Sequence, residues 1–138
     1  MTEADEFQEC AGCICAGVRR AARTLSRHYE RHMRGTGLRG AQFSTLVVLA
    51  RGGPMPIGRL AKLLGVERTT LTRNLKPLEN KHWVKFSGDA DGRVRFVAIT
   101  AKGRAVASAA VPSWRAAQAS VGPKLKELRL AELLARAA

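Results

Sequence analysis

Acidic residues are scarce in this chain of 138 residues. Asp and Glu number 11 against 24 Lys and Arg, so the formal net charge is +13. A surplus of this size points to a polyanionic partner, nucleic acid first and an anionic membrane second. The surplus is largest over residues 51–104, where twelve Lys and Arg face four acids. We therefore expect the polyanion to bind the middle of the chain.

Long apolar runs are missing as well. No stretch approaches the roughly 18 apolar residues of a membrane span, and the first ten residues, MTEADEFQEC, are acidic where a signal peptide is positive. We therefore expect a cytoplasmic protein without a membrane partner. In that reducing compartment the three cysteines, Cys10, Cys13 and Cys15, are not a structural disulfide set.

Groups that perform catalysis are few. The chain has three histidines and a single tyrosine. It contains no Gly-x-Ser-x-Gly motif, no phosphate-binding loop and no paired carboxylates in a polar setting. The sequence thus predicts that the protein is not an enzyme, and it predicts neither catalytic residues nor a cofactor.

Helical periodicity is what the chain has in abundance. After an acidic, frayed start over residues 1–9, a long helix is expected from Ile14 to Met33. A second helix is expected over residues 43–50. A third, Ile57–Leu64, ends at Gly65.

The C-terminal part is helical too. Thr100 is a fair N-cap for an alanine-rich helix, Pro112 is expected to interrupt that helix, and Val121–Pro123 to separate a last one. The last helix carries a leucine set: Leu125, Leu128, Leu130, Leu133 and Leu134. The N- and C-terminal helices cannot bury both of their faces alone, so a two-fold dimer is expected.

The stretch GVERTTLTRNLKPLE, residues 65–79, combines a leucine stripe with hydroxyls and cations. Its leucines recur at i, i+4 and i+7, which is one buried helix face: Leu71, Leu75 and Leu78. Pro77 cannot donate to the carbonyl of Arg73, so a bend is expected there. A helix, a turn with glycine and this second helix form a helix-turn-helix arrangement.

An alternating pattern follows, in WVKFSGDADGRVRFVAIT. Apolar and polar residues alternate on both sides of the segment SGDADG, which predicts a β-hairpin with a polar tip. A helix-turn-helix followed by a hairpin is a winged helix. The expected fold class is mainly α with a small β-hairpin wing, a winged helix-turn-helix core flanked by N- and C-terminal dimerisation helices.

A winged helix fits DNA, because its recognition helix enters the major groove, where hydroxyl, methyl and guanidinium groups read base edges. The contacts expected from this helix are Arg68, Thr69, Thr70, Thr72, Arg73 and Lys76. On the wing, Arg93 and Arg95 are two apart and are expected to project on the same side of a strand, toward a narrow minor groove. Asp91 is expected to hold an arginine extended. The remaining cations of this region are expected to contact phosphate or solvent: Arg51, Arg59, Lys62 and Lys85.

The segment LAKLLGVERTTLTRNLKPLENKHWVKFSGDADGRVRFVAITAKG resembles the core of the multiple antibiotic resistance regulator (MarR) family of winged-helix repressors. The matching pieces are LA..L, TTLTRNLKPLE, DGR and ITAKG. The resemblance implies an obligate homodimer with entwined N- and C-terminal helices that binds a pseudo-palindromic double-stranded DNA operator. It also implies release of DNA when a small aromatic or anionic effector binds, or when a cysteine is oxidised.

The same resemblance implies a domain organisation. Residues 1–138 are expected to form a single MarR-like domain, with residues 38–103 as its DNA-binding winged helix-turn-helix part. Residues 10–36 and 104–138 are expected to be dimerisation helices. One place departs from the family: His82-Trp83 stands where a Gly-Leu pair commonly follows the recognition helix. Helices often end there in a left-handed residue, which histidine adopts less readily than glycine.

Two groups of residues, three cysteines and two histidines, allow more than one interpretation. Cys10, Cys13 and Cys15 fit a redox sensor, a thiolate metal site or small packing residues at the start of a dimer helix. His28 and His32 lie four apart on one helix face and fit a metal pair. Without a further ligand nearby, we favour solvated or dimer-contact histidines and expect no metal site.

The aromatic residues and the function of the whole chain keep alternatives too. Trp83, Trp114 and Tyr29 fit either a ligand pocket or plain core.

The function expected is that of a sequence-specific transcriptional regulator, and within that class a repressor. The alternative is a non-specific or architectural nucleic-acid-binding protein, which differs in its ratio of specific to random DNA affinity.

Overall fold

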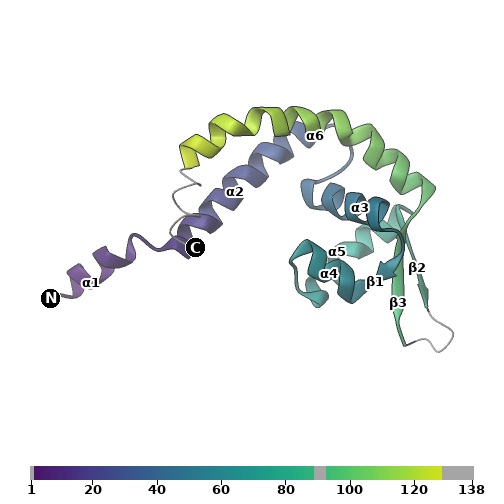
Figure 1. Ribbon diagram of the computed structural model, residues 1–138, viewed down its shortest axis with the longest axis horizontal. Coiled ribbons are helices and arrows are strands. Elements are labelled where there is room, and N and C mark those ends of the chain that lie inside the picture. Colours follow the sequence, from purple (N-terminus) through teal and green to yellow (C-terminus); the bar gives the residue numbers. More distant parts are fainter. Residues whose placement is uncertain (1, 89–92, 129–138) are drawn as a thin grey trace. The chain divides into compact units, whose positions relative to one another are not determined.

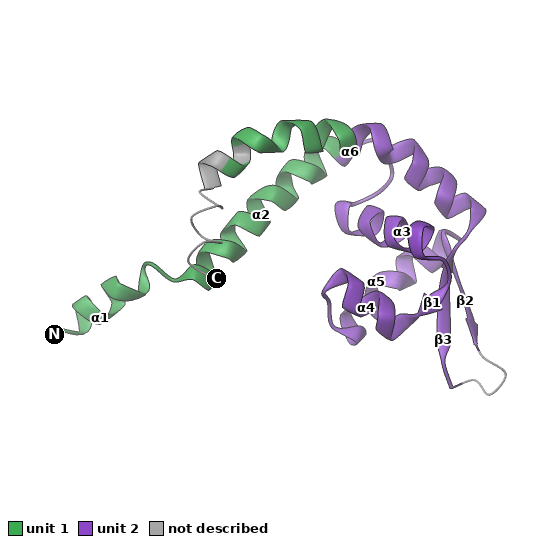
Figure 2. Ribbon diagram, viewed as in Figure 1, with its two compact units in different colours: residues 1–32, 114–138 green, residues 33–113 purple. Residues whose placement is uncertain are grey.

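The computed structural model describes residues 2–88 and 93–128, which form six helices and a three-stranded sheet (Figure 1). The helices are α1 (Glu3–Cys10), α2 (Ile14–Met33), α3 (Gly40–Gly52), α4 (Ile57–Leu64), α5 (Arg68–Asn80) and α6 (Ala101–Leu128), and the strands are β1 (Met55–Pro56), β2 (Val84–Gly88) and β3 (Arg95–Ile99). Two compact units divide the chain (Figure 2): unit 1 comprises residues 1–32 and 114–138, and unit 2 comprises residues 33–113. This architecture confirms the expected fold class.

Unit 2 contains the sheet, whose strand order is β1-β3-β2 with both pairs antiparallel. Val97 of β3 pairs with Phe86 of β2 on one side and with Met55 of β1 on the other. Val97 is fully buried. Because side chains alternate along a strand, Arg95 shares the face of Val97. The wing is therefore anchored to the core by the same face that carries this arginine.

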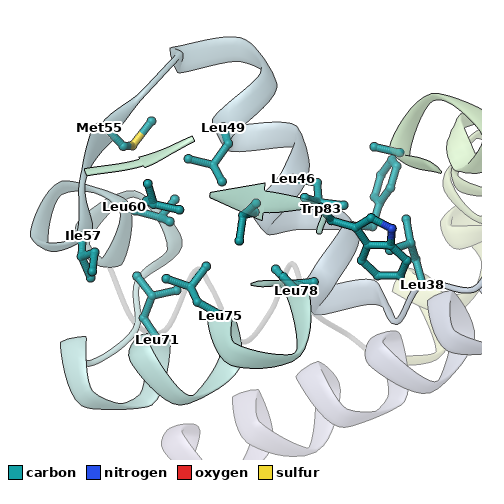
Figure 3. Close-up of a cluster of buried hydrophobic side chains, with 14 of the residues drawn as sticks. Leu38, Leu46, Leu49, Met55, Ile57, Leu60, Leu71, Leu75, Leu78 and Trp83 are labelled. Atoms are coloured by element: carbon teal, nitrogen blue, oxygen red, sulfur yellow. The ribbon is translucent and has the colours of Figure 1, made fainter. Parts of the chain in front are cut away.

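The core of unit 2 is one apolar cluster drawn from α3, α4, α5, the first part of α6 and the sheet (Figure 3). Its leucines are almost completely buried: Leu46, Leu49, Leu60, Leu71, Leu75 and Leu78. Burial of a leucine side chain contributes about 1.5–3 kcal/mol, so the leucine stripe of α5 fixes this helix to the unit, as predicted. Trp83 belongs to the same cluster and is a core residue.

The turn between α4 and α5 is built around Gly65. This residue is left-handed, with φ 68° and ψ 33°. The N–H of Gly65 donates to the carbonyl of Lys62 at 3.2 Å, and that of Val66 to the carbonyl of Ala61 at 3.0 Å. These two bonds close α4 and redirect the chain into α5. The helix-turn-helix predicted from the sequence is confirmed.

Unit 1 pairs α2 with the later part of α6. His28 of α2 is buried, and its Nε2 lies 3.1 Å from the carbonyl oxygen of Ala117 and 3.0 Å from Oγ of Ser120. Because a carbonyl only accepts, the Nε2 atom carries the proton. The hydroxyl of Tyr29 donates to the side-chain oxygen of Gln118. Hydrogen bonds around a buried histidine thus join these two helices.

Residues 3–10 form helix α1, which corrects the expectation of a frayed acidic start. Thr2 and Asp5 make a capping box: the Thr2 N–H donates to the Asp5 carboxylate at 2.9 Å, and the Asp5 N–H donates to the Thr2 hydroxyl at 3.4 Å. The backbone N–H of Thr2, and then its hydroxyl, lower the pKa of Asp5. No residue of α1 is buried, so the capping box of its first turn, and not packing, is the stabilising contact that the structure shows for this helix.

Helix α6 runs without a break from Ala101 to Leu128. This corrects the breaks expected at Pro112 and at Val121–Pro123. A proline inside a helix leaves one carbonyl, here that of Ser108, without its N–H donor, but the alanines around Pro112 are strong helix formers that offset the loss. The leucines expected farther on lie outside the described residues: Leu130, Leu133 and Leu134. None of the helices in the described ranges is long and apolar enough to cross a membrane.

Candidate nucleic-acid interface

The polar residues of α5 lie on the surface of unit 2. Five of the six helix residues expected to contact DNA are exposed and Thr70 is half-buried: Arg68, Thr69, Thr70, Thr72, Arg73 and Lys76. The leucine stripe is at most 1% exposed. Pro77 is exposed and follows these residues along the helix. The N-terminal half of α5 therefore concentrates hydroxyls and cations on surface that a groove can reach.

The first turn of α5 offers backbone donors as well. Its N-cap, Glu67, makes no side-chain cap hydrogen bond. The first N–H groups of a helix have no partner within the helix and are suited to binding a phosphate. The hydroxyl of Thr72 donates to the carbonyl of Arg68 at 3.0 Å. Thr72 therefore has a methyl group and an acceptor oxygen left for a base edge.

The wing arginines differ in their surroundings. Arg95 opens β3 opposite Gly88, whereas Arg93 is exposed and precedes the strand. The same-side projection expected from strand alternation therefore does not apply to Arg93. The Cζ atom of Arg95 lies 4.4 Å from the centroid of the Phe86 ring, a cation–π contact that leaves guanidinium donors for a phosphate. Asp91 lies outside the described residues.

Helix α5 ends in a left-handed residue that is not glycine. His82 has φ 60°. The N–H of His82 donates to the carbonyl of Glu79 and the N–H of Trp83 to the carbonyl of Leu78, both at 2.9 Å. This is the hydrogen-bond pair of a Schellman ending. Trp83 packs in the cluster that contains Leu78, so His82 and Trp83 take the roles of the expected Gly-Leu pair.

Thr100 ties this helix exit to the start of α6. Its Oγ1 donates to the carbonyl of His82 at 2.6 Å and accepts the N–H of Gly103 at 3.0 Å, and its own N–H donates to the carbonyl of Trp83 at 2.9 Å. A Cβ on Gly103 would overlap the carbonyl oxygen of Trp83. The N-cap role predicted for Thr100 is confirmed. Sequence reasoning missed the bond to His82 and the need for glycine at position 103, for which ITAKG was the available signal.

Further cations lie on the surface of unit 2. Those expected to contact phosphate or solvent are all exposed: Arg51, Arg59, Lys62 and Lys85. Together with the cations of α5 and the wing, they give unit 2 a positive surface, and such a surface attracts a polyanion.

The three cysteines of unit 1 are exposed. Cys10 ends α1, Cys13 lies between the helices, and Cys15 is in α2. The Nη2 atom of Arg19 donates to Sγ of Cys15 at 3.0 Å. Their exposure makes these thiols accessible to an oxidant.

The two histidines of α2 bond to the protein itself. Besides the His28 contacts described above, Nδ1 of His32 lies 2.9 Å from the carbonyl oxygen of His28. The two rings lie 4.6 Å apart between centroids. Within residues 2–88 and 93–128, no group of three or more His, Cys, Asp or Glu is arranged to hold a metal ion. Trp114 of α6 is partly exposed, at 37%.

Comparison with known proteins places this geometry in a family. The profile described as a winged helix DNA-binding domain matches residues 38–103. The transcriptional regulator MosR of M. tuberculosis, solved in complex with DNA, is 42% identical with a TM-score of 0.73, and the match covers 90% of this chain and 96% of that chain. A MarR-family transcriptional regulator from Silicibacter pomeroyi is 28% identical with a TM-score of 0.62, covering 86% of this chain and 84% of that one.

A curated relative gives the same class of protein. The HTH-type transcriptional regulator YwoH of Bacillus subtilis is 31% identical over 83 residues, which is 60% of this chain. The match spans 61% of the length of that relative. The fold, the family profile and the relatives all indicate a winged-helix transcriptional regulator rather than an enzyme. The chain belongs to the multiple antibiotic resistance regulator (MarR) family of winged helix-turn-helix transcriptional regulators.

Proposed function

We propose that this protein is a homodimer that binds a pseudo-palindromic DNA operator and represses transcription there. The observation that carries the proposal is the division of α5 into two faces. Leu71, Leu75 and Leu78 hold the helix to the core, while Arg68 and Arg73 stand on the exposed face among three threonines. A helix that served only packing or non-specific charge would not need short hydroxyls on that face.

The proposed complex has two α5 helices in successive major grooves. Half-sites then lie about one helical turn apart, roughly 34 Å. Phosphate contacts from the surrounding cations supply much of the affinity, so binding weakens steeply as salt rises. The solved complex of MosR with DNA supports this partner, since MosR is the relative at 42% identity.

Removal of one arginine from each DNA-facing element tests the proposed contacts. Arg73→Ala on α5 and Arg93→Ala on the wing are each expected to weaken operator binding by about 1–3 kcal/mol, the usual contribution of an arginine that reads a base. The operator is first obtained by selection from random duplexes, and affinity is then measured by fluorescence anisotropy at fixed salt.

Arg115→Ala provides the matched control, because it removes the same charge from an exposed residue of unit 1. This control is expected to leave operator affinity nearly unchanged. Unchanged affinity and footprint in both Arg73→Ala and Arg93→Ala would show that these arginines do not contact the operator.

A non-specific architectural protein is the alternative, since charge alone suits it. The ratio of specific to random DNA affinity at one salt concentration separates the two. A specific regulator binds its site typically 10³–10⁷-fold more tightly than random DNA, whereas an architectural protein shows a ratio near unity. The threonines on the exposed face of α5 favour the first outcome.

The proposed signal is either cysteine oxidation or a small aromatic or anionic effector. The exposure of Cys10, Cys13 and Cys15 supports the first. Mild peroxide is then expected to release the operator from the wild type but not from a triple Cys→Ser variant. Release that persists in the triple variant would exclude the thiols and leave the effector as the signal.

A further inference from the structure

Four elements of unit 2 meet at one point, the root of the wing. Helix α5 ends there, β2 begins, β3 ends and α6 begins. The first hairpin pair at this root is Val84 with Ile99. The residues next to this pair are Trp83 and Thr100. Contacts that fix their backbone also fix the angle between the hairpin and the recognition helix α5.

Thr100 makes three of the hydrogen bonds at this root. Its N–H donates to the carbonyl of Trp83 at 2.9 Å, one step beyond the last hairpin pair. Its hydroxyl donates to the carbonyl of His82 at 2.6 Å and accepts from the N–H of Gly103 at 3.0 Å. The hydroxyl therefore serves the helix exit and the start of α6 with one atom.

The bond to His82 reaches a residue in a demanding conformation. His82 is the one non-glycine residue with positive φ in the described ranges, a conformation that costs energy for a side chain bearing Cβ. The Schellman bonds hold it from the side of α5, and the Thr100 hydroxyl holds its carbonyl from the side of α6. Loss of that hydroxyl removes the hydrogen bond to the His82 carbonyl, and from the side of α6 only the bond between the Thr100 N–H and the neighbouring Trp83 carbonyl is left.

Small changes at the root are amplified at the wing tip. β2 has five residues, so at ~3.3 Å per residue it is about 16 Å long. A tilt of about 10° at the root then moves the tip by about 3 Å, the length of a whole hydrogen bond. Contacts made by a wing arginine with DNA could not survive such a shift.

We propose that Thr100 is a positioning residue, which acts through the His82 carbonyl to hold the wing at a fixed angle to the recognition helix. The inference rests on the proposed operator binding. It assigns to the Thr100 hydroxyl a part in specificity, although Thr100 itself does not contact DNA.

The test compares Thr100→Val, which removes the hydroxyl at nearly constant shape, with Thr100→Ser, which keeps it. Affinity for the selected operator and for a random duplex, hydroxyl-radical footprints and thermal unfolding are measured for each. Thr100→Val is expected to lose about tenfold in operator affinity, the equivalent of one net hydrogen bond. Its random-duplex affinity should stay within about twofold, since phosphate contacts dominate there. Protection should disappear at the flanks that the wing covers, and Thr100→Ser should behave as wild type.

Three results would overturn the inference. The first is a Thr100→Val variant with unchanged operator affinity and an unchanged footprint. The second is a Thr100→Val variant that loses operator affinity and random-duplex affinity in equal measure. The third is a Thr100→Ser variant with the same defect as Thr100→Val. A wild type without any preferred sequence would instead remove the proposed function itself, and the positioning role with it.

A second pair of variants approaches the same contact from the other side, should Thr100→Val fail to fold. His82→Gly keeps the carbonyl and adopts positive φ freely, so it should bind the operator as wild type does. His82→Val is β-branched and resists positive φ, so it should lose operator affinity and flank protection. Equal operator affinity in the two His82 variants would contradict the positioning role.

Discussion

The interiors of the two units differ in kind. Unit 2 buries leucines that have no exposed surface, among them Leu46, Leu49 and Leu75. Unit 1 buries a histidine, His28, which is held by hydrogen bonds. Unit 2 has an apolar cluster of its own, to which α3, α4, α5, the first part of α6 and the sheet contribute. The buried apolar residues of unit 1 in the described ranges are two alanines, Ala21 and Ala117, and Phe7 is 67% exposed. The difference indicates that unit 2 can fold around its own core, while unit 1 needs additional apolar contact.

The polar seam of unit 1 is the set of hydrogen bonds by which His28 and Tyr29 of α2 contact Ala117, Gln118 and Ser120 of α6. No buried side-chain nitrogen or oxygen in the described residues lacks a hydrogen-bond partner. Satisfied polar groups of this kind fix the register of two helices but add little net stability per bond. Unit 1 therefore has a specified geometry and a small intrinsic driving force, which is the state expected of helices that complete their burial in a dimer.

The largest effect is expected from the core of unit 2. Leu75→Ala should reduce the free energy of unfolding by about 2–5 kcal/mol, because it removes a fully buried side chain and leaves a cavity. Denaturant unfolding followed by Trp83 fluorescence, in a Trp114→Phe background, reports on this unit alone. Leu63→Ala is the control, since Leu63 is 56% exposed and should change stability by less than about 0.5 kcal/mol. Similar losses in both variants would contradict a self-sufficient core.

The contrast between the units also explains what the sequence could predict. Leucine spacing at Leu71, Leu75 and Leu78 identified the buried face of α5 because burial in a regular helix follows a period of 3.6 residues. Gly65 identified the turn because its conformation is a local property. Both features belong to unit 2, where local pattern and tertiary packing agree.

The remaining features depend on contacts between distant parts of the chain or on competing local effects. The hydroxyl of Thr100 reaches His82 across 18 positions, which no spacing rule encodes. The expected frayed start overlooked the Thr2–Asp5 capping box, and the expected break at Pro112 gave too little weight to the surrounding alanines. Arg93 and Arg95 were paired by a strand rule that holds only from Arg95 onward.

A smaller effect is expected at the seam of unit 1. His28→Ala removes a buried donor shared by Ala117 and Ser120, and it should cost about 2 kcal/mol, near the middle of the range for disrupted buried polar contacts. Hydrogen exchange should accelerate in α2 and remain unchanged in α5. Thr24→Ala is the matched control, because Thr24 is half-buried and its hydroxyl bonds within its own helix, to the carbonyl of Arg20. Equal acceleration in both variants would show that His28 is not the centre of the seam.

The smallest effect is expected from dilution, and it separates the two units without any substitution. If unit 1 completes its core against a second copy, each tenfold dilution at concentrations above the dissociation constant lowers the stability of the dimer by about 1.4 kcal/mol. Unit 2 has no such dependence, because its leucines are buried within one chain. Hydrogen exchange measured at several protein concentrations should therefore show α2 amides that speed up on dilution and α5 amides that do not. Exchange that is independent of concentration in both helices would contradict the homodimer, whereas equal dependence in both would mean that the core of unit 2 also relies on the partner.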